Sequence, residues 1–149
     1  MVKRFYPSQP VVGVGAIIIC DGKILLEKRK GEPGKGKWSV PGGLVELGER
    51  AEDAVVREVK EETGLVVADP ELIDVVDNIV LDENGEVKYH FVIIDYFVQL
   101  KGGEMRAADD ADELRWVPLN EAEKYDLTKT LRAFLKRNMP RLEKLNSCS

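Results

Sequence analysis

The segment Arg50–Glu62 constrains this chain most, because it is predicted to form a helix whose apolar side also carries glutamates. On a helical wheel with a step of about 100° per residue, one apolar stripe forms. Its members are Ala51, Ala54, Val55 and Val59. Glu58 and Glu62 fall in the middle of that stripe, and Glu61 falls at its edge. Gly64 follows where a glycine in the left-handed conformation ends many helices. The segment therefore predicts a surface helix with carboxylates along its packing face.

Carboxylates in an apolar stripe need a positive partner. Glu58 and Glu62 lie four residues apart and repel each other by a few tenths of a kcal/mol even when exposed. Partly buried and unpaired, they would cost far more or take up protons. Glutamate runs are usually solvated helix faces, but such a face would lie opposite the stripe. Several carboxylate oxygens on one rigid face suit a hard divalent cation such as Mg²⁺ or Mn²⁺. We therefore predict a metal site here, with Arg57 orienting a carboxylate.

Strand and helix signals alternate along the rest of the chain. β-Branched, apolar or alternating segments predict strands at Pro10–Cys20, Lys23–Lys28, Glu71–Leu81, Val87–Leu100 and Glu113–Val117. Asp21-Gly22 and Asn84-Gly85 predict hairpin turns, and Thr128 can cap a closing helix. The order strands, helix, strands, helix, without an internal repeat or linker, predicts one mixed α/β or α+β domain over residues 1–149.

Charge and composition exclude several classes of protein. The net charge of −5 argues against a general nucleic-acid binder, which would usually carry a basic excess. No apolar stretch approaches the ~18 residues of a membrane span, and the first residues lack a signal-peptide core. Cys20 and Cys148 are too few for a disulfide framework, and Cys148 lies in a tail expected to fray. We expect a soluble cytoplasmic protein with reduced cysteines.

The segment Gly43–Leu65 resembles the Nudix box, whose pattern is G-x5-E-x7-R-E-U-x-E-E-x-G-U, with U an aliphatic residue. The matching residues are Gly43, Glu49, Arg57, Glu58, Val59, Glu61, Glu62, Gly64 and Leu65. The flanking segments Leu25–Arg29, Trp38–Gly43 and Glu113–Leu119 are also similar to the family, although only the box is highly specific. The resemblance implies the Nudix fold, an α/β/α sandwich with a mixed sheet and a helix on each side.

The resemblance also implies a reaction and roles for the box residues. The reaction is hydrolysis of a nucleoside diphosphate linked to another moiety. Divalent metal, Mg²⁺ with Mn²⁺ as an alternative, would bind to Gly42 through its backbone carbonyl and to Glu58, Glu61 and Glu62. Arg57 would orient the site, and Glu49 would support it or reach a further metal. Such metal ions neutralise pyrophosphate charge, so an acidic protein can act on phosphates.

A further acid or general base in this family often lies outside the box, at a variable position. The acidic run 109–113, ahead of Trp116, is the natural place to look. Asp110 is the first candidate and Glu113 is its rival, while an acidic surface turn explains either residue equally well.

Four other residues are candidates for substrate contact. Arg29 and Lys37 could bind phosphate, because both lie on segments leading into the box. Trp38 could stack on a base or pack in the core, and Gly43 leaves room for close approach of the backbone. His90, the single histidine, lies in an alternating strand and is predicted to be a sheet-face residue rather than a catalyst.

Three functions remain open, and they differ in substrate or in chemistry. ADP-ribose or a related nucleotide sugar is the first choice of substrate, although Val80 replaces a proline that marks many ADP-ribose enzymes. A MutT-type enzyme that hydrolyses oxidised or non-standard nucleoside triphosphates is the alternative. A non-catalytic nucleotide sensor is the third, but such domains usually lose box glutamates, which this chain keeps. Dimerisation is common among similar proteins. No membrane partner and no stable nucleic-acid partner is expected.

Overall fold

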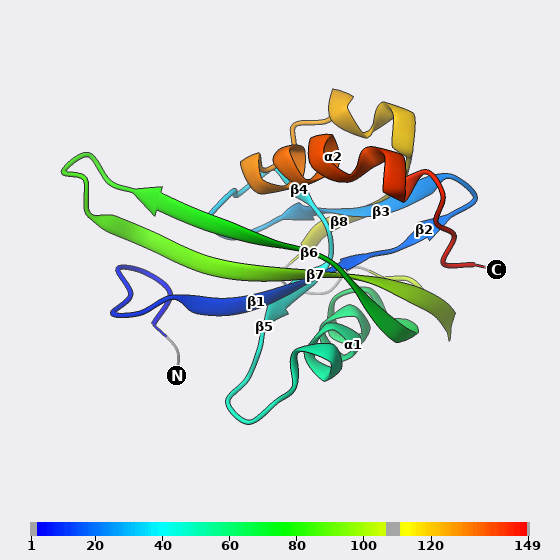
Figure 1. The fold of residues 1–149 in the computed structure, drawn as a ribbon, viewed down its shortest axis with the longest axis horizontal. Helices are drawn as coiled ribbons and strands as arrows, with labels where there is room; N and C mark the ends of the chain where they lie inside the picture. The colour runs from blue at the N-terminus through cyan, green and yellow to red at the C-terminus, as the bar shows by residue number, and fades with distance from the viewer. Residues whose placement is uncertain (1–2, 107–110, 149) are drawn as a thin grey trace.

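The computed structural model describes residues 3–106 and 111–148. Strands form the middle of the molecule, with helix α1 (Ala51–Thr63) on one side and helix α2 (Lys129–Leu142) on the other (Figure 1). A short 3₁₀ helix, η1 (Leu119–Lys124), precedes α2. This arrangement confirms the predicted α/β/α architecture with a mixed sheet.

The mixed sheet has the strand order β5-β1-β7-β6. Its strands are β1 (Val11–Ile17), β5 (Gly42–Leu44), β6 (Leu65–Leu81) and β7 (Val87–Gly103). β1 and β7 run parallel, whereas the β1–β5 and β6–β7 pairs are antiparallel. A register row across this sheet joins Gly42, Gly15, Asp95 and Asp74.

The second sheet is antiparallel and is built around β3. Its strands are β2 (Ile19–Cys20), β3 (Lys23–Arg29), β4 (Trp38–Ser39) and β8 (Ala111–Pro118). Asp21 and Gly22 connect β2 to β3 with φ angles of 52° and 78°, as the predicted tight turn requires.

Strands lie where the sequence predicted them, but their bounds differ. The single strand predicted at Pro10–Cys20 is divided at Ile18 into β1 and β2, which belong to different sheets. β6 begins at Leu65, directly after α1, whereas the sequence predicted a start at Glu71. The pairing register with β7 shifts between Ala68 and Glu71, so the strand passes the Asp69-Pro70 break as a bulge instead of starting after it. The short strands β4 and β5 were not predicted.

Each helix covers its own hydrophobic cluster. Ala54, Val55 and Val59 of α1 are fully buried against residues of the mixed sheet, including Tyr96 and Val98. On the other side, Leu131, Phe134 and Leu135 of α2 pack with residues of both sheets, including Ile24, Phe97 and Val117. The two helices therefore hold the two sheets together from opposite sides.

The C-terminal tail corrects one prediction. Cys20 and Cys148 form a disulfide with their Cα atoms 5.2 Å apart, so the prediction of reduced cysteines and a frayed tail was wrong. Ser147 is buried, and its backbone forms hydrogen bonds with Ile19 and Leu100. The prediction of a reducing compartment rested on unpaired cysteines and loses that support. Among the described residues, no helix is long and apolar enough to cross a membrane.

Candidate active site

The three glutamates of α1 differ in exposure as the helical wheel predicts. Glu62 is 6% exposed, the Glu58 side chain 13% and the Glu61 side chain 60%. Glu58 and Glu62 continue the face that packs on the sheet, whereas Glu61 lies at its border. Two carboxylates are therefore held at the contact between α1 and the mixed sheet.

Strand β5 approaches these carboxylates through two glycines. The backbone N–H of Gly42 donates a hydrogen bond of 3.3 Å to Glu62 Oε2. A Cβ atom on Gly43 would lie 2.2 Å from the carboxyl carbon of Glu58. Any side chain at position 43 would displace Glu58, so the glycine allows the helix carboxylate to lie against the strand backbone.

Arg57 organises the exposed side of this cluster. Its Nε and Nη2 donate to the two carboxylate oxygens of Glu49 at 2.7 and 2.8 Å. Its Nη1 donates to Glu58 at 2.8 Å and to Glu61 at 3.1 Å. A further bond from Nη2 to the carbonyl of Leu44, 3.0 Å long, ties the guanidinium to β5. One arginine thus fixes three of the acidic side chains relative to the sheet.

These bonds change the proton affinities of both partners. Hydrogen bonds from the Arg57 side chain, and then from the backbone N–H of Glu46, lower the pKa of Glu49 to about 2. The hydrogen bond with Glu49 is the main cause of a raised pKa for Arg57, whose burial works in the opposite direction. Glu49 and Arg57 therefore stay charged throughout the physiological pH range.

The donor set has the chemistry that a hard divalent cation needs. Glu58, Glu61 and Glu62 offer carboxylate oxygens on one helix face, and the glycine backbone of β5 lies beside them. Within residues 3–106 and 111–148, no three Asp, Glu, His or Cys side chains are already gathered as a metal site. Arg57 holds Glu58 and Glu61, so their oxygens would have to reorient to share a cation.

Comparison with known proteins accounts for this arrangement. The family model described as NUDIX domain matches residues 9–139. The chain belongs to the Nudix family. It is 42% identical over 129 residues to an ADP-ribose pyrophosphatase of Methanocaldococcus jannaschii, covering 85% of this chain and 74% of that protein. The chain is therefore a hydrolase of the Nudix type.

Two further relatives widen the comparison. A putative 8-oxo-dGTP diphosphatase 2 of Mycobacterium tuberculosis is 33% identical over 132 residues, covering 81% of this chain and 89% of that protein. The crystal structure of a MutT NUDIX hydrolase from Burkholderia pseudomallei is 40% identical, with a TM-score of 0.77. It covers 87% of this chain and 98% of that one. The Nudix fold is thus shown along most of the chain.

Three predicted substrate contacts lie outside the Nudix box and have structural partners of their own. Arg29 Nε donates to the carbonyl of Pro33 at 2.8 Å, and Lys37 forms an exposed ion pair of 3.0 Å with Asp126. Trp38 is 8% exposed and packs edge-on against Tyr125, with ring centroids 5.5 Å apart. The structure therefore favours core packing for Trp38.

The acidic run before Trp116 is only partly described. Asp110 lies outside the described residues. Glu113 is on β8 and forms an ion pair with Arg115, whose guanidinium lies 5.0 Å from the centroid of the Trp38 ring. The role of Glu113 as a general base stays a prediction.

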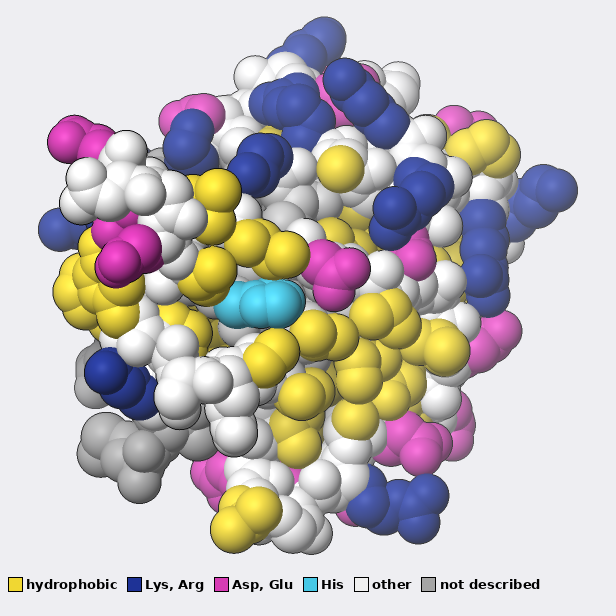
Figure 2. Space-filling model, turned by 60° about the vertical axis from the view of Figure 1, so that its left-hand side comes forward, with side chains coloured by type: hydrophobic (Ala, Val, Ile, Leu, Met, Phe, Trp, Pro, Cys, Tyr) yellow, Lys and Arg dark blue, Asp and Glu magenta, His cyan; other side chains and the backbone are white. Residues whose placement is uncertain are grey.

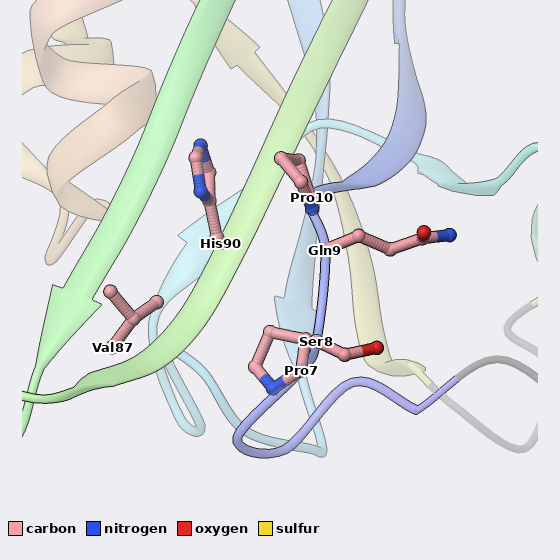
Figure 3. Close-up of a pocket in the computed structure, with 6 residues that line it drawn as sticks. All are labelled: Pro7, Ser8, Gln9, Pro10, Val87 and His90. Carbon is pink, nitrogen blue, oxygen red and sulfur yellow. The ribbon is translucent and has the colours of Figure 1, made fainter.

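His90 lies on β7, opposite Ile79 of β6, as a sheet-face residue. It lines a surface hollow of about 200 Å³ with Val87 and the N-terminal residues 7–10 (Figure 3). Figure 2 shows the single histidine with hydrophobic side chains on several sides. None of the box residues lines this hollow, which agrees with the prediction that His90 is not catalytic.

A buried acid on the central strand β7, Asp95, was not predicted from the sequence. It is 5% exposed, and burial is the main cause that raises its pKa to about 7, followed by the nearby Asp74 carboxylate. Arg137 acts in the opposite direction. The signal was present in the sequence, because Asp95 is the one charged residue in the apolar run 91–98.

Proposed function

We propose that this chain is a Mg²⁺-dependent pyrophosphohydrolase that cleaves ADP-ribose or a related nucleotide sugar. The observation that carries the reaction class is the docking of Glu58 and Glu62 of α1 against Gly42 and Gly43 of β5. This contact puts carboxylate oxygens and strand backbone at one place, which is what a metal-assisted phosphoanhydride hydrolase requires. The name of the Methanocaldococcus jannaschii relative, at 42% identity, supports ADP-ribose as the substrate.

Each box residue has a defined task in this proposal. The carboxylates of Glu58, Glu61 and Glu62 and the backbone carbonyl of Gly42 would hold the metal. Bound Mg²⁺ would neutralise the pyrophosphate charge and lower the pKa of an attacking water. Arg57 positions Glu58 and Glu61 beside β5 before the metal binds, and Glu49 holds Arg57 through two hydrogen bonds. Asp110 or Glu113 is the proposed general base.

A MutT-type nucleoside triphosphate pyrophosphohydrolase is the second candidate. It is supported by the relative named putative 8-oxo-dGTP diphosphatase 2, at 33% identity. Both candidates use the same α1 site, and they differ only in the ligand. A non-catalytic sensor is the least supported function, since all the box glutamates are retained. Homodimerisation is a further proposal, which light scattering of the purified protein would test.

A substrate panel separates these functions. The panel contains ADP-ribose, nucleotide sugars, dinucleoside polyphosphates and (d)NTPs, each with and without Mg²⁺, and the products are resolved by mass. We expect Mg²⁺-dependent formation of AMP and ribose 5-phosphate from ADP-ribose. Release of pyrophosphate from a triphosphate, at higher kcat/KM, would favour the MutT-type function instead. If no compound in the panel is hydrolysed, the non-catalytic nucleotide sensor would be the remaining candidate function.

Variants test the site itself. Glu61→Gln and Glu62→Gln should abolish Mg²⁺-dependent hydrolysis while the circular dichroism spectrum stays unchanged. Gly43→Ala should lower kcat about 100-fold, because the new Cβ displaces Glu58 by an ångström or more. Gly31→Ala is the matched control, since its Cβ would meet no atom within 4 Å. Wild-type activity in Glu62→Gln would remove the metal assignment.

A further inference from the structure

The register row Gly42–Gly15–Asp95–Asp74 crosses the mixed sheet from the candidate metal site to α2. Asp95 is two strands from Gly42 in this register. Because neighbouring strands lie about 4.8 Å apart, the two backbone positions are about 10 Å apart. A Cβ atom on Gly15 would lie 2.2 Å from Asp95 Oδ1 and 3.2 Å from a methyl group of Val40. The Asp95 side chain therefore leans over β1, toward the strand that carries Gly42.

The two acids at the end of this row differ in their partners. Asp74 accepts hydrogen bonds from Arg137 and from Asn138 of α2, the latter 2.9 Å long. Asp95 is 5% exposed, and no residue in the described ranges 3–106 and 111–148 donates a hydrogen bond to it or forms an ion pair with it. A buried carboxyl without a hydrogen-bond donor is costly, and a ligand that supplied the donor would offset this cost.

The strand beside Asp95 contributes only backbone to this face, and the space above Gly15 holds the Asp95 carboxylate. β1 carries glycines at both positions of this face, Gly13 and Gly15, so a strip of backbone without side chains runs along the sheet. Half-buried Leu44 and Ile93 flank Gly13 in the next row, and their side chains would touch a Cβ placed there at 3.8 and 3.9 Å. Glycine inside a strand often marks a close approach of ligand or backbone.

We propose that Asp95 is a recognition residue for the nucleoside part of the substrate, and that it accepts a hydrogen bond from a ribose hydroxyl or an exocyclic amine. This inference rests on the proposed function. A phosphate is excluded as the partner, because a buried carboxylate would repel it. The phosphates instead belong beside the α1 glutamates and their metal, whereas the Asp95 side chain lies with Phe97 on the α2 side of the sheet, two strands and about 10 Å from Gly42.

Equilibrium binding of AMP, measured by calorimetry in Mg²⁺, tests the proposal without requiring turnover. Asp95→Leu keeps the branched outline of the side chain but removes its hydrogen bond, so the Kd for AMP should rise about 10-fold or more. Asp95→Asn keeps a hydrogen-bonding group and should lose less. Asp77→Asn, an exposed β6 acid on the opposite face, is the matched control and should bind AMP as the wild type does.

Analogues identify the group that Asp95 contacts. 2′-Deoxy-AMP and 3′-deoxy-AMP each remove a hydroxyl, and inosine monophosphate replaces the exocyclic amine. The analogue that lacks the contacted group should bind the wild type about 10-fold more weakly than AMP does. Its Kd should be the same for Asp95→Leu as for the wild type, because the contact is already absent. Equal weakening of AMP and every analogue in the variant would show a merely structural role and overturn the proposal. An unchanged Kd, or no binding of AMP to the wild type, would overturn it as well.

Failure of the proposed function gives a different pattern. If the wild type hydrolyses nothing on the panel but binds AMP through Asp95, only the proposed function is wrong. If the wild type hydrolyses ADP-ribose, and Asp95→Leu has the same ratios of Kd between AMP and its analogues as the wild type, only the proposed role of Asp95 is wrong.

Discussion

Asp95 and the α1 glutamates show two ways in which a single carboxylate can be kept in a packed molecule. Glu58 is held by a charged hydrogen bond from Arg57. Asp95 has no such donor among the described residues, and burial raises its pKa instead. The first kind of residue offers carboxylate oxygens to a cation. The second kind is about half protonated at pH 7 and suits a neutral hydrogen-bonding group.

The raised pKa of Asp95 predicts how stability depends on pH. The folded-state pKa is about 7, above the ordinary value of 3.8, so the folded protein binds the proton more tightly. This stabilisation is fully present below about pH 4 and is lost as the pH rises to about 7. The change is on the order of a few kcal/mol. Nearby Asp74 and Arg137 are the charged groups that act on this equilibrium.

Urea unfolding of the wild type and Asp95→Asn at intervals between pH 4 and pH 8 measures the effect. The free energy of unfolding of the wild type should fall relative to the variant across this window, because asparagine does not titrate. Parallel curves for the two proteins would contradict the assignment. Asp77→Asn, which changes an exposed carboxylate, should follow the wild type.

The sequence predicted one of these residues and not the other for a physical reason. Glu58 and Glu62 fall within the apolar stripe of α1, and a helical wheel drawn from the sequence shows these charged residues at apolar positions. Asp95 lies in a strand that is buried on both faces, where a near-continuous apolar run gives no face to compare. Its contact with Gly15 depends on the parallel register of β1 and β7, which the sequence alone does not fix.

At the scale of elements, α1 and β6 depend on one residue, Gly64. It ends α1 with φ of 79°, and its N–H bonds to the carbonyl of Lys60. A Cβ atom there would lie 2.3 Å from the carbonyl oxygen of Glu104, just beyond the end of β7. The helix end is thus packed against the neighbouring strand with no space for a side chain.

Gly64→Ala should therefore be more destabilising than an alanine at an open left-handed position. Gly85 in the β6–β7 hairpin has the same φ of 79° with no atom within 4 Å, so Gly85→Ala isolates the backbone strain of about 1 kcal/mol. We expect Gly64→Ala to cost at least about 1 kcal/mol more, seen as a lower Tm. Equal Tm values for the two variants would show that the Glu104 contact relaxes without cost.

Element prediction succeeded where local chemistry decides the structure. Asp21-Gly22 and Gly64 have the predicted left-handed conformations, and Thr128 caps α2 by accepting a hydrogen bond from the N–H of Leu131. β4 and β5 were missed because each is held by pairing with a distant strand rather than by its own composition. Local signals fix turns and caps, whereas short strands exist only through their neighbours.

At the scale of the whole molecule, the C-terminal tail ties the two sheets together. Ser147 bonds through its backbone to Ile19 of β2 and to Leu100 of β7, and Cys148 is joined to Cys20. Two cysteines at a sequence separation of 128 give no spacing pattern, so only the folded structure shows their proximity. The tail thus closes the chain into a single long covalent loop.

A loop of this length predicts a large effect of reduction. The chain-entropy account gives about 4 to 5 kcal/mol for a disulfide that closes a loop of roughly 100 residues or more. Cys148→Ser should therefore lower the Tm of the oxidised protein by about 10 °C, at roughly 2 to 4 °C per kcal/mol. A reductant should lower the wild-type Tm to the same value and leave the variant unchanged. Identical melting of the oxidised wild type and the variant would show that the hydrogen bonds of Ser147 hold the tail without the disulfide.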